Sequence, residues 1–284
     1  MTKPILAVST VCLGLQLAGA AEPAKTSWTD ELLTPVANPI FFESPDIGSE
    51  LRPIYVYHRL NDKFLPGDVQ LMALQFRLAL TERLALIATK DGYMTIRPDA
   101  GGDLEGWADI GGGLKYALID DQENKFILTP GVKFELPTGD SDVFQGNGDG
   151  EFDLFVSAAK GFEKLQLMGT LGVRLPIDDD EETSQMHYSL QLAYANCQWF
   201  KPFVALNGYT VLSEGTGPAI GSEGYDVINF GTSNAGGETQ IVLGAGFRSS
   251  LSKSLDLGVA YEKDVTHDDG IFDDRLTVDV IWKF

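Results

Sequence analysis

The feature that most constrains this chain is a two-residue alternation of apolar and polar side chains that recurs in segment after segment. Successive side chains of a β-strand point to opposite faces, so this period indicates strands with one apolar and one polar face. The sequence therefore predicts an all-β protein. The clearest instance occupies residues 275–284, where five apolar residues share one face: Leu276, Val278, Val280, Trp282 and Phe284.

Composition excludes several other classes. The net charge of −20 argues against nucleic-acid binding, which needs a basic footprint. A hydrophobic content of 44% argues against disorder, and two cysteines cannot build a disulfide scaffold. Beyond the first twenty residues, no apolar run approaches the roughly 20 residues that a membrane-spanning helix requires. The 284 residues are expected to form one large domain.

Residues 1–20 have the pattern of a secretory signal peptide. Lys3 gives a positive start, Ile5–Leu17 is mostly apolar, and Ala18–Ala20 forms a small-residue cleavage site. We therefore expect export from the cytoplasm. Cys197 is then the single cysteine of the mature chain, so no intramolecular disulfide is expected.

In an exported chain, strands with one apolar and one small or polar face fit a transmembrane barrel, with lipid outside and water inside. An even number of antiparallel strands closes such a barrel without an exposed edge. The connections alternate long and short, which predicts long outer loops, short periplasmic turns and both chain ends in the periplasm. The expected architecture is a single antiparallel barrel over residues 51–284 with twelve strands, at 52–59, 68–80, 83–97, 105–118, 125–136, 151–160, 164–175, 185–195, 199–212, 238–248, 254–264 and 274–284.

Two stretches resemble known proteins. The last strand, ending at Phe284, is similar to the terminal signal that the barrel-assembly machinery of bacteria recognises. The segment Gly131–Asp140, the glycine-rich Gly146–Gly150 and the hairpin ending at Arg174–Pro176 resemble outer-membrane proteins of the meta-pathway of phenol degradation family. That resemblance implies an outer-membrane barrel that passes small organic compounds.

The two-residue alternation predicts that charged side chains face the lumen of the barrel. As a transport site, these charges would set the field that solutes feel; alternatively they pair across the barrel and make it rigid, which we favour for most of them. The predicted lumen-facing residues are Arg77, Asp109, Lys115, Lys133, Glu135, Arg174, Arg248, Asp256, Glu262, Arg275, Asp279 and Lys283.

Two weaker patterns concern metals and catalysis. Asn147, Asp149, Glu151 and Asp153 are spaced by two residues and offer oxygen ligands for Ca²⁺, although a solvated acidic rim explains the acidic loops more simply. His187 and Ser189 have the spacing of outer-membrane lipid hydrolases, but their parity directs them inward and the next strand offers no orienting partner. We therefore expect neither an enzyme nor a cofactor.

Residues 21–50 are apolar and rich in proline, which excludes a regular helix or strand. Either they fold into the lumen as a plug or they lie along the periplasmic base. The predicted function is passage of small molecules, aromatic or hydrophobic ones among them, through a porin-like barrel. The alternative is a structural or surface-interaction barrel with a closed lumen, and a lipid hydrolase is the third. Expected partners are outer-membrane lipid and lipopolysaccharide, the latter bridged to the acidic loops by divalent cations.

Overall fold

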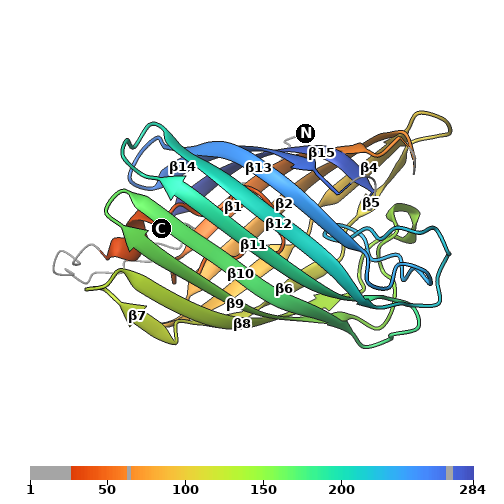
Figure 1. Cartoon of the computed structure of the whole chain (residues 1–284), viewed down its shortest axis with the longest axis horizontal. Helices are drawn as coiled ribbons and strands as arrows, with labels where there is room; N and C mark the ends of the chain where they lie inside the picture. Colours follow the sequence, from red (N-terminus) through yellow and green to blue (C-terminus); the bar gives the residue numbers. More distant parts are fainter. Residues whose placement is uncertain (1–26, 63–64, 267–270) are drawn as a thin grey trace, which may run out of the picture.

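A computed structural model describes residues 27–62, 65–266 and 271–284. The predicted signal peptide, residues 1–20, lies outside these ranges. The strands form one antiparallel sheet in which β1 pairs with both β2 and β15, so the sheet closes on itself (Figure 1). The strands are β1 (Glu50–Leu60), β2 (Gly67–Ala79), β3 (Leu84–Lys90), β4 (Tyr93–Pro98), β5 (Leu104–Trp107), β6 (Ile110–Tyr116), β7 (Ile119–Asp121), β8 (Phe126–Leu136), β9 (Glu151–Phe162), β10 (Leu165–Pro176), β11 (Ser184–Tyr194), β12 (Lys201–Ser213), β13 (Thr239–Ser250), β14 (Leu255–Asp264) and β15 (Phe272–Lys283).

This arrangement confirms the predicted twelve-stranded barrel. β3 and β4 together form one wall strand, β5 and β6 form another, and β7 is a short extension paired with β8. Two short 3₁₀ helices, η1 (Trp28–Glu31) and η2 (Ser141–Val143), complete the elements. No helix in the described part of the chain is long and apolar enough to cross a membrane.

Between β3 and β4 the positions that face the barrel interior change from odd to even residue numbers. Ala85, Ile87 and Thr89 face the interior in β3, whereas Met94 and Ile96 do so in β4. Gly92, at φ +126°, lies between them, and a Cβ there would be 2.6 Å from the Met72 carbonyl oxygen. An uninterrupted two-residue period through this strand is therefore impossible.

Two prolines lie where the sheet lacks a partner on one side. Pro130 in β8 is opposite the gap between β6 and β7, so one side of β8 is unpaired there. Pro202 in β12 pairs with β13, while the ladder to β11 begins at Phe203. Proline cannot donate a ladder hydrogen bond, so both positions suit it.

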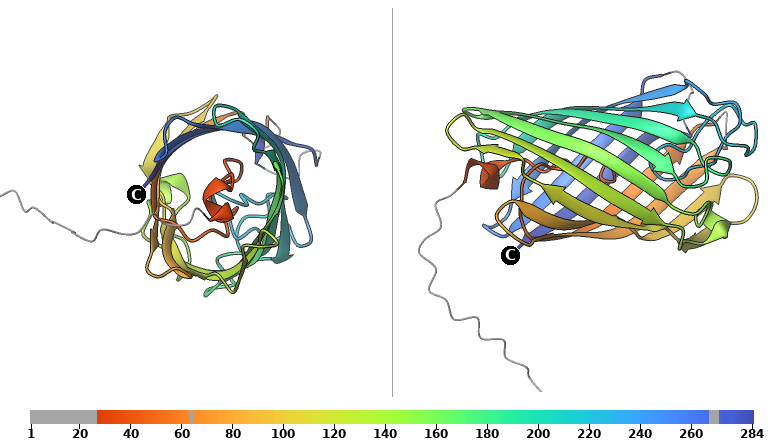
Figure 2. Two further views of the ribbon diagram at one scale, coloured as in Figure 1. Left: turned by 90° about the vertical axis from the view of Figure 1, so that its left-hand side faces the viewer. Right: turned by 90° about the horizontal axis from the view of Figure 1, so that it is seen from below.

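The two ends of the barrel differ. One end carries short turns such as 80–83 and 251–254 together with the C-terminus, and the other carries the long loops 137–150, 177–183 and 214–238. Figure 2 shows the N-terminal segment, coloured red, inside the ring of strands. Residues 32–45 of this segment are buried throughout. The interior is thus occupied by chain as well as by side chains of the wall.

Candidate functional site

The barrel interior contains an irregular segment whose backbone is held by side chains of the wall. Its prolines, Pro35, Pro39 and Pro45, exclude regular structure, so its carbonyl groups need partners elsewhere. Arg52 Nη2 donates to the Pro35 carbonyl at 2.6 Å, and Gln75 Nε2 donates to that of Pro39 at 2.9 Å.

Further wall side chains continue this pattern along the segment. They come from strands all around the barrel, so the contacts fix the whole path of residues 31–45. In each of these hydrogen bonds a wall side chain donates to a backbone carbonyl of the segment. The pairs, donor first, are Gln166 to Glu31, Gln191 to Leu33, Arg248 to Thr34, Lys133 to Ile40, Ser157 to Glu43, Thr170 to Glu43, Lys115 to Ser44, and Thr129 to Pro45.

Glu43 is the charged anchor of the segment. Its carboxylate accepts from Arg77 Nε at 3.0 Å and Nη2 at 2.6 Å, and from Lys115 Nζ at 2.7 Å. All three side chains are almost fully buried, with exposures of 1%, 5% and 1% for Glu43, Arg77 and Lys115. Hydrogen-bonded charge pairs of this kind are strongly coupled, because breaking one leaves a buried charge uncompensated.

The structure places the predicted lumen residues inside the barrel. Some of them hold other segments of the chain. Arg77 and Lys115 bind Glu43 of the N-terminal segment. Asp109 accepts from the Gly139 and Gly146 amides of a long loop. Glu135 and Lys283 are partly exposed. The others pair mostly with each other or with their neighbours, as Lys133 with Asp153, Arg174 with Glu151, Arg248 with Asp279, Arg275 with Glu262, Lys90 with Glu135, and Lys283 with Asp256.

Sequence reasoning missed several charged residues of this network, among them Arg52, Asp226 and Glu43. Arg52 donates from Nε to Asp279 at 2.7 Å, Asp226 of a long loop pairs with Arg275, and Glu43 lies in the N-terminal segment. Arg52 lies before a proline in a strand whose inner face also contains Ile54 and Val56, so its parity gave no clear indication. Glu43 and Asp226 lie in irregular segments, where no period exists to place them.

The proposed calcium ligands do not assemble into a site. Glu151 binds Arg174 Nε at 2.6 Å, and Asp153 binds Lys133 at 2.7 Å, while Asp149 is exposed. Asn147 donates instead to the Phe144 carbonyl at 3.2 Å. In the part of the chain that the structure describes, no group of three or more His, Cys, Asp or Glu residues is arranged to hold a metal ion. The carboxylates at 151 and 153 are used in ion pairs of the wall.

His187 and Ser189 face the interior and serve different partners. His187 Nε2 lies 2.8 Å from Asp153 Oδ1, an acidic partner two strands away in β9 rather than in the adjacent β12. Ser189 Oγ accepts from Asn38 Nδ2 of the N-terminal segment at 3.1 Å. Ser189 is thus a contact of the interior segment, and both residues are buried away from the lipid face.

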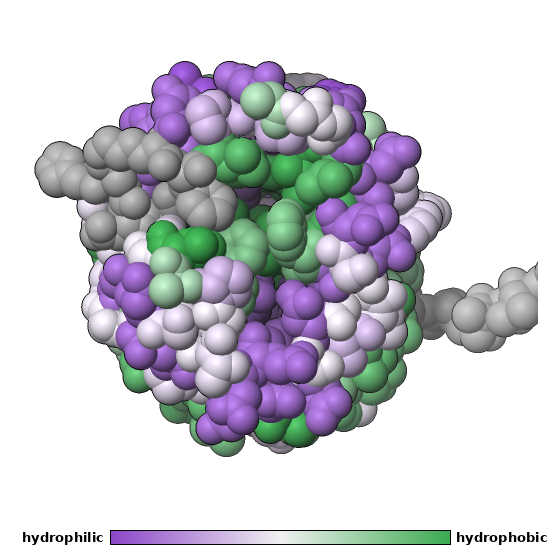
Figure 3. Space-filling view, turned by 90° about the vertical axis from the view of Figure 1, so that its right-hand side faces the viewer, coloured by the Kyte–Doolittle hydropathy of each residue, from purple (hydrophilic) through white to green (hydrophobic). Residues whose placement is uncertain are grey.

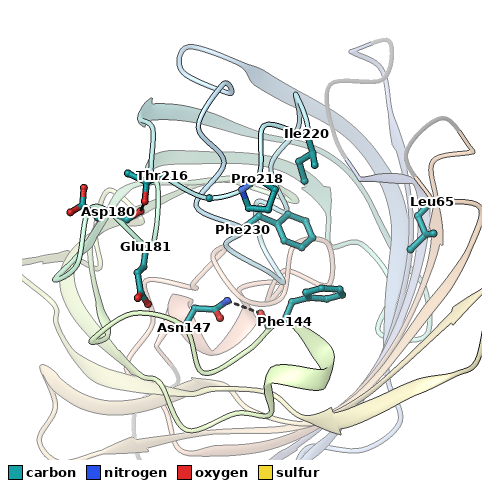
Figure 4. A pocket seen from close by; sticks show the side chains of 10 residues that line it. Leu65, Phe144, Asn147, Asp180, Glu181, Thr216, Pro218, Ile220 and Phe230 are labelled. Carbon is teal, nitrogen blue, oxygen red and sulfur yellow. Dashed lines mark hydrogen bonds between the residues drawn. The ribbon is translucent and has the colours of Figure 1, made fainter.

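The long-loop end contains an apolar cavity of about 530 Å³. Figure 3 shows this end, with apolar residues gathered in the hollowed centre and hydrophilic residues around the rim. Figure 4 shows Phe144 and Phe230 at the middle of the cavity, with Ile220, Pro218 and Leu65 near them and Asn147, Asp180 and Glu181 on the other side. The two phenyl rings meet edge to face at 5.5 Å between centroids.

Below the cavity, an apolar cluster continues into the barrel. Leu65 and Phe230, which line the cavity, pack against this cluster, and its members include Ile40 and Phe41 of the N-terminal segment. Most of the other members come from β1, β2, β4, β12 and the loop 214–238, with Val56, Leu71, Met94, Val211, Val227 and Ile228 among them. A continuous cluster of packed apolar side chains therefore connects the mouth with the interior segment.

Two acidic groups in the loops have shifted pKa values. Burial, reinforced by the nearby Glu151 carboxylate, raises the pKa of Glu182 to about 8, although Arg174 acts in the opposite direction. The pKa of Asp226 is lowered: burial alone would raise it, but the attraction of Arg275 outweighs that effect. Glu182 is therefore neutral at pH 7, whereas Asp226 is a charged link between the loop and the wall.

Comparison with known proteins identifies the fold. No family model and no curated protein matches the chain. An outer-membrane channel from Pseudomonas putida F1 superposes with a TM-score of 0.62 at 17% identity, covering 89% of this chain and all of that one. The NanC porin gives 0.54 at 8% identity over 83% of this chain, and the β domain of the Bordetella autotransporter BrkA gives 0.52 at 13% over 84%.

These likenesses define the class: the chain has the fold of outer-membrane β-barrels, which channels and porins share. At such identities they show the fold and no more. The resemblance of the Gly131–Gly150 region to the meta-pathway of phenol degradation family stays a prediction.

Proposed function

We propose that this protein is an outer-membrane channel for small, largely apolar organic molecules, and that its N-terminal segment keeps the channel closed. The observation that supports this proposal is the apolar mouth cavity together with the apolar cluster that continues from it to Phe41. The interior also contains paired charges, which bind each other rather than an apolar solute, and two further apolar clusters pack around the N-terminal segment. A pathway for hydrophilic solutes would not need an apolar cluster beneath its mouth.

In this proposal, the segment 27–49 acts as a plug that closes the barrel interior. Its contacts are hydrogen bonds, ion pairs and apolar packing from an irregular backbone. None of its described residues belongs to a strand paired with the wall. Each neutral hydrogen bond among them contributes about 1 kcal/mol net, because water replaces it when it breaks. A segment held in this way can leave the lumen without opening the barrel wall.

The surroundings follow from the same fold. Exposed apolar residues such as Met72, Leu171 and Trp282 cover the outer wall and suit lipid. We expect the strand with Leu276, Val278, Val280, Trp282 and Phe284 to be recognised by the barrel-assembly machinery, and the acidic loops to meet lipopolysaccharide through divalent cations. Both are proposals about partners that the chain meets in the outer membrane of bacteria.

The main alternative, a structural barrel with a closed lumen, draws support from the density of contacts around the segment 27–49. Uptake of 1-N-phenylnaphthylamine, a neutral aromatic dye that intact lipopolysaccharide excludes, distinguishes the two. Cells that express the protein in the outer membrane should take up the dye faster than cells with an empty vector, and Ile220→Asn should reduce this gain several-fold. Leu251→Asn, an equally exposed leucine in a short turn, is the control. Uptake equal to that of the empty vector would favour the structural barrel.

A further inference from the structure

The three loops that line most of the mouth cavity carry charges of one sign. Loop 137–150 contains three acidic residues, loop 177–183 contains five and loop 214–238 contains four, and none of them contains Lys, Arg or His. The remaining contributor, the loop at 61–66, adds one Asp and one Lys in the sequence and places Leu65 in the cavity. A negative potential is therefore expected where a solute first meets the protein.

Within the cavity, the apolar and acidic groups lie on different sides. The phenyl rings of Phe144 and Phe230 form the apolar centre. On the other side, Glu181 accepts from the Gly148 amide at 3.0 Å, which holds the carboxylate at the cavity wall. Asp180 lies beside it, and its carbonyl oxygen accepts from the Thr216 amide at 2.6 Å. Figure 4 shows this separation.

A second observation concerns the adjacent residue, Glu182. Its side chain is buried, and among the described residues its Oε2 atom has no hydrogen-bond partner. A Cβ at Gly148, next to the cavity residue Asn147, would be 2.5 Å from this atom. A buried carboxyl oxygen without a hydrogen-bond partner thus lies behind the acidic side of the cavity.

From this arrangement we propose that the mouth cavity binds small organic cations with an apolar body, such as alkyl or aryl ammonium compounds. The apolar body packs against Phe144 and Phe230, and the ammonium group is attracted by the exposed ring faces and by Glu181 and Asp180. The proposal rests on the proposed function in one respect, because it takes this cavity to be the outer mouth of the channel. Anions of the same size are repelled by all three loops.

Three ligands with the same body test the proposal: 3-phenylpropylammonium, 3-phenylpropanol and 3-phenylpropionate. Their binding to the purified full-length mature chain is measured by titration calorimetry at low salt. We expect the ammonium compound to bind about 10-fold more tightly than the alcohol, because the ring faces and the carboxylates attract only the cation. The propionate should bind more weakly than the alcohol, and added salt should reduce these differences.

Variants separate the acidic side from the apolar centre. Asp180→Asn combined with Glu181→Gln should bring the ammonium and alcohol within about twofold, while Glu82→Gln combined with Glu163→Gln, in the short turns, should leave the preference unchanged. Phe230→Leu should weaken the ammonium compound more than the alcohol, because the leucine keeps apolar bulk but lacks an aromatic ring.

The outcomes distinguish this inference from the proposed function. Equal binding of the three ligands, or a preference that survives the Asp180–Glu181 double substitution, would overturn the cation site even if cells take up the neutral dye. A clear cation preference without any dye uptake would support the site and contradict the channel.

Discussion

The carboxylate of Glu43 offers a direct way to loosen the interior segment. Glu43→Gln keeps the size of the side chain but removes its charge, so Lys115 loses its carboxylate partner while Arg77 keeps Glu50 at 3.2 Å. Removing one member of a buried, hydrogen-bonded charge pair costs about 3–5 kcal/mol. Because Arg77 retains a partner, we use the lower end of this range. A change of about 3 kcal/mol raises the ratio of displaced to inserted segment by about 100-fold.

The assay is single-channel recording of the full mature protein in a planar bilayer. Glu43→Gln should increase the fraction of time in the open state, while Glu31→Gln, at an exposed position of the same segment, should behave as the wild type. Adding Lys115→Met to Glu43→Gln removes the uncompensated charge and should restore most of the closed state. An open fraction that Glu43→Gln leaves unchanged would refute the role of this ion pair in holding the segment.

Three further predictions follow from the same structure. Deleting residues 21–48 should produce larger and steadier conductance steps, and conductance equal to that of the intact chain would contradict the plug. The pKa of Glu182 is raised from 4.5 to about 8, so its contribution to the stability of the folded loops is full below pH 4.5 and is lost as the pH rises toward 8. A protease should therefore cleave loop 177–183 faster at pH 9 than at pH 6. Glu182→Gln should remove this difference. Deleting Phe284 should lower the amount of barrel assembled in cells several-fold, measured by heat-modifiable mobility, whereas normal assembly would show that the last residue is not needed.

Much of the fold could be predicted because two different solvents act on every strand. Lipid selects apolar residues outside, and the lumen selects small or polar residues inside, so the alternation in β10 and β15 locates strands and faces together. The prediction failed to give a clear parity in the third strand, because the bulge around Gly92 moves the inward positions from odd to even numbers. A local backbone event of this kind leaves only a glycine in the sequence.

The candidate site was harder to predict because it depends on register. Lys133 is directly opposite Asp153, and Asp153 is opposite Arg174 on its other side, so this carboxylate belongs to a ladder of charges. Along the sequence alone, Asp153 and Glu151 continue the acidic spacing of a flexible loop and suggested a calcium site instead. The pairing of strands distant in sequence decides between these interpretations.

The path of the N-terminal segment could not be derived from its own residues. Prolines exclude regular structure at Pro35 and Pro39 but do not specify where the chain goes. Its position depends on donors such as Gln191 and Arg248, which point inward from strands far along the chain. The mouth cavity has the same origin, since Phe144 and Phe230 meet only because two long loops fold toward each other.

A reversible cross-link between the segment and the wall tests the central claim most directly. A Cβ built at Gly244 lies 3.5 Å from the Cβ of Ala37, a separation that suits a disulfide. Ala37→Cys and Gly244→Cys are introduced with Cys197→Ser, which removes the exposed native thiol. Conductance and uptake of the neutral dye should be absent in the oxidised protein and appear after reduction. Equal conductance and uptake in the oxidised and reduced states would contradict a channel that this segment closes.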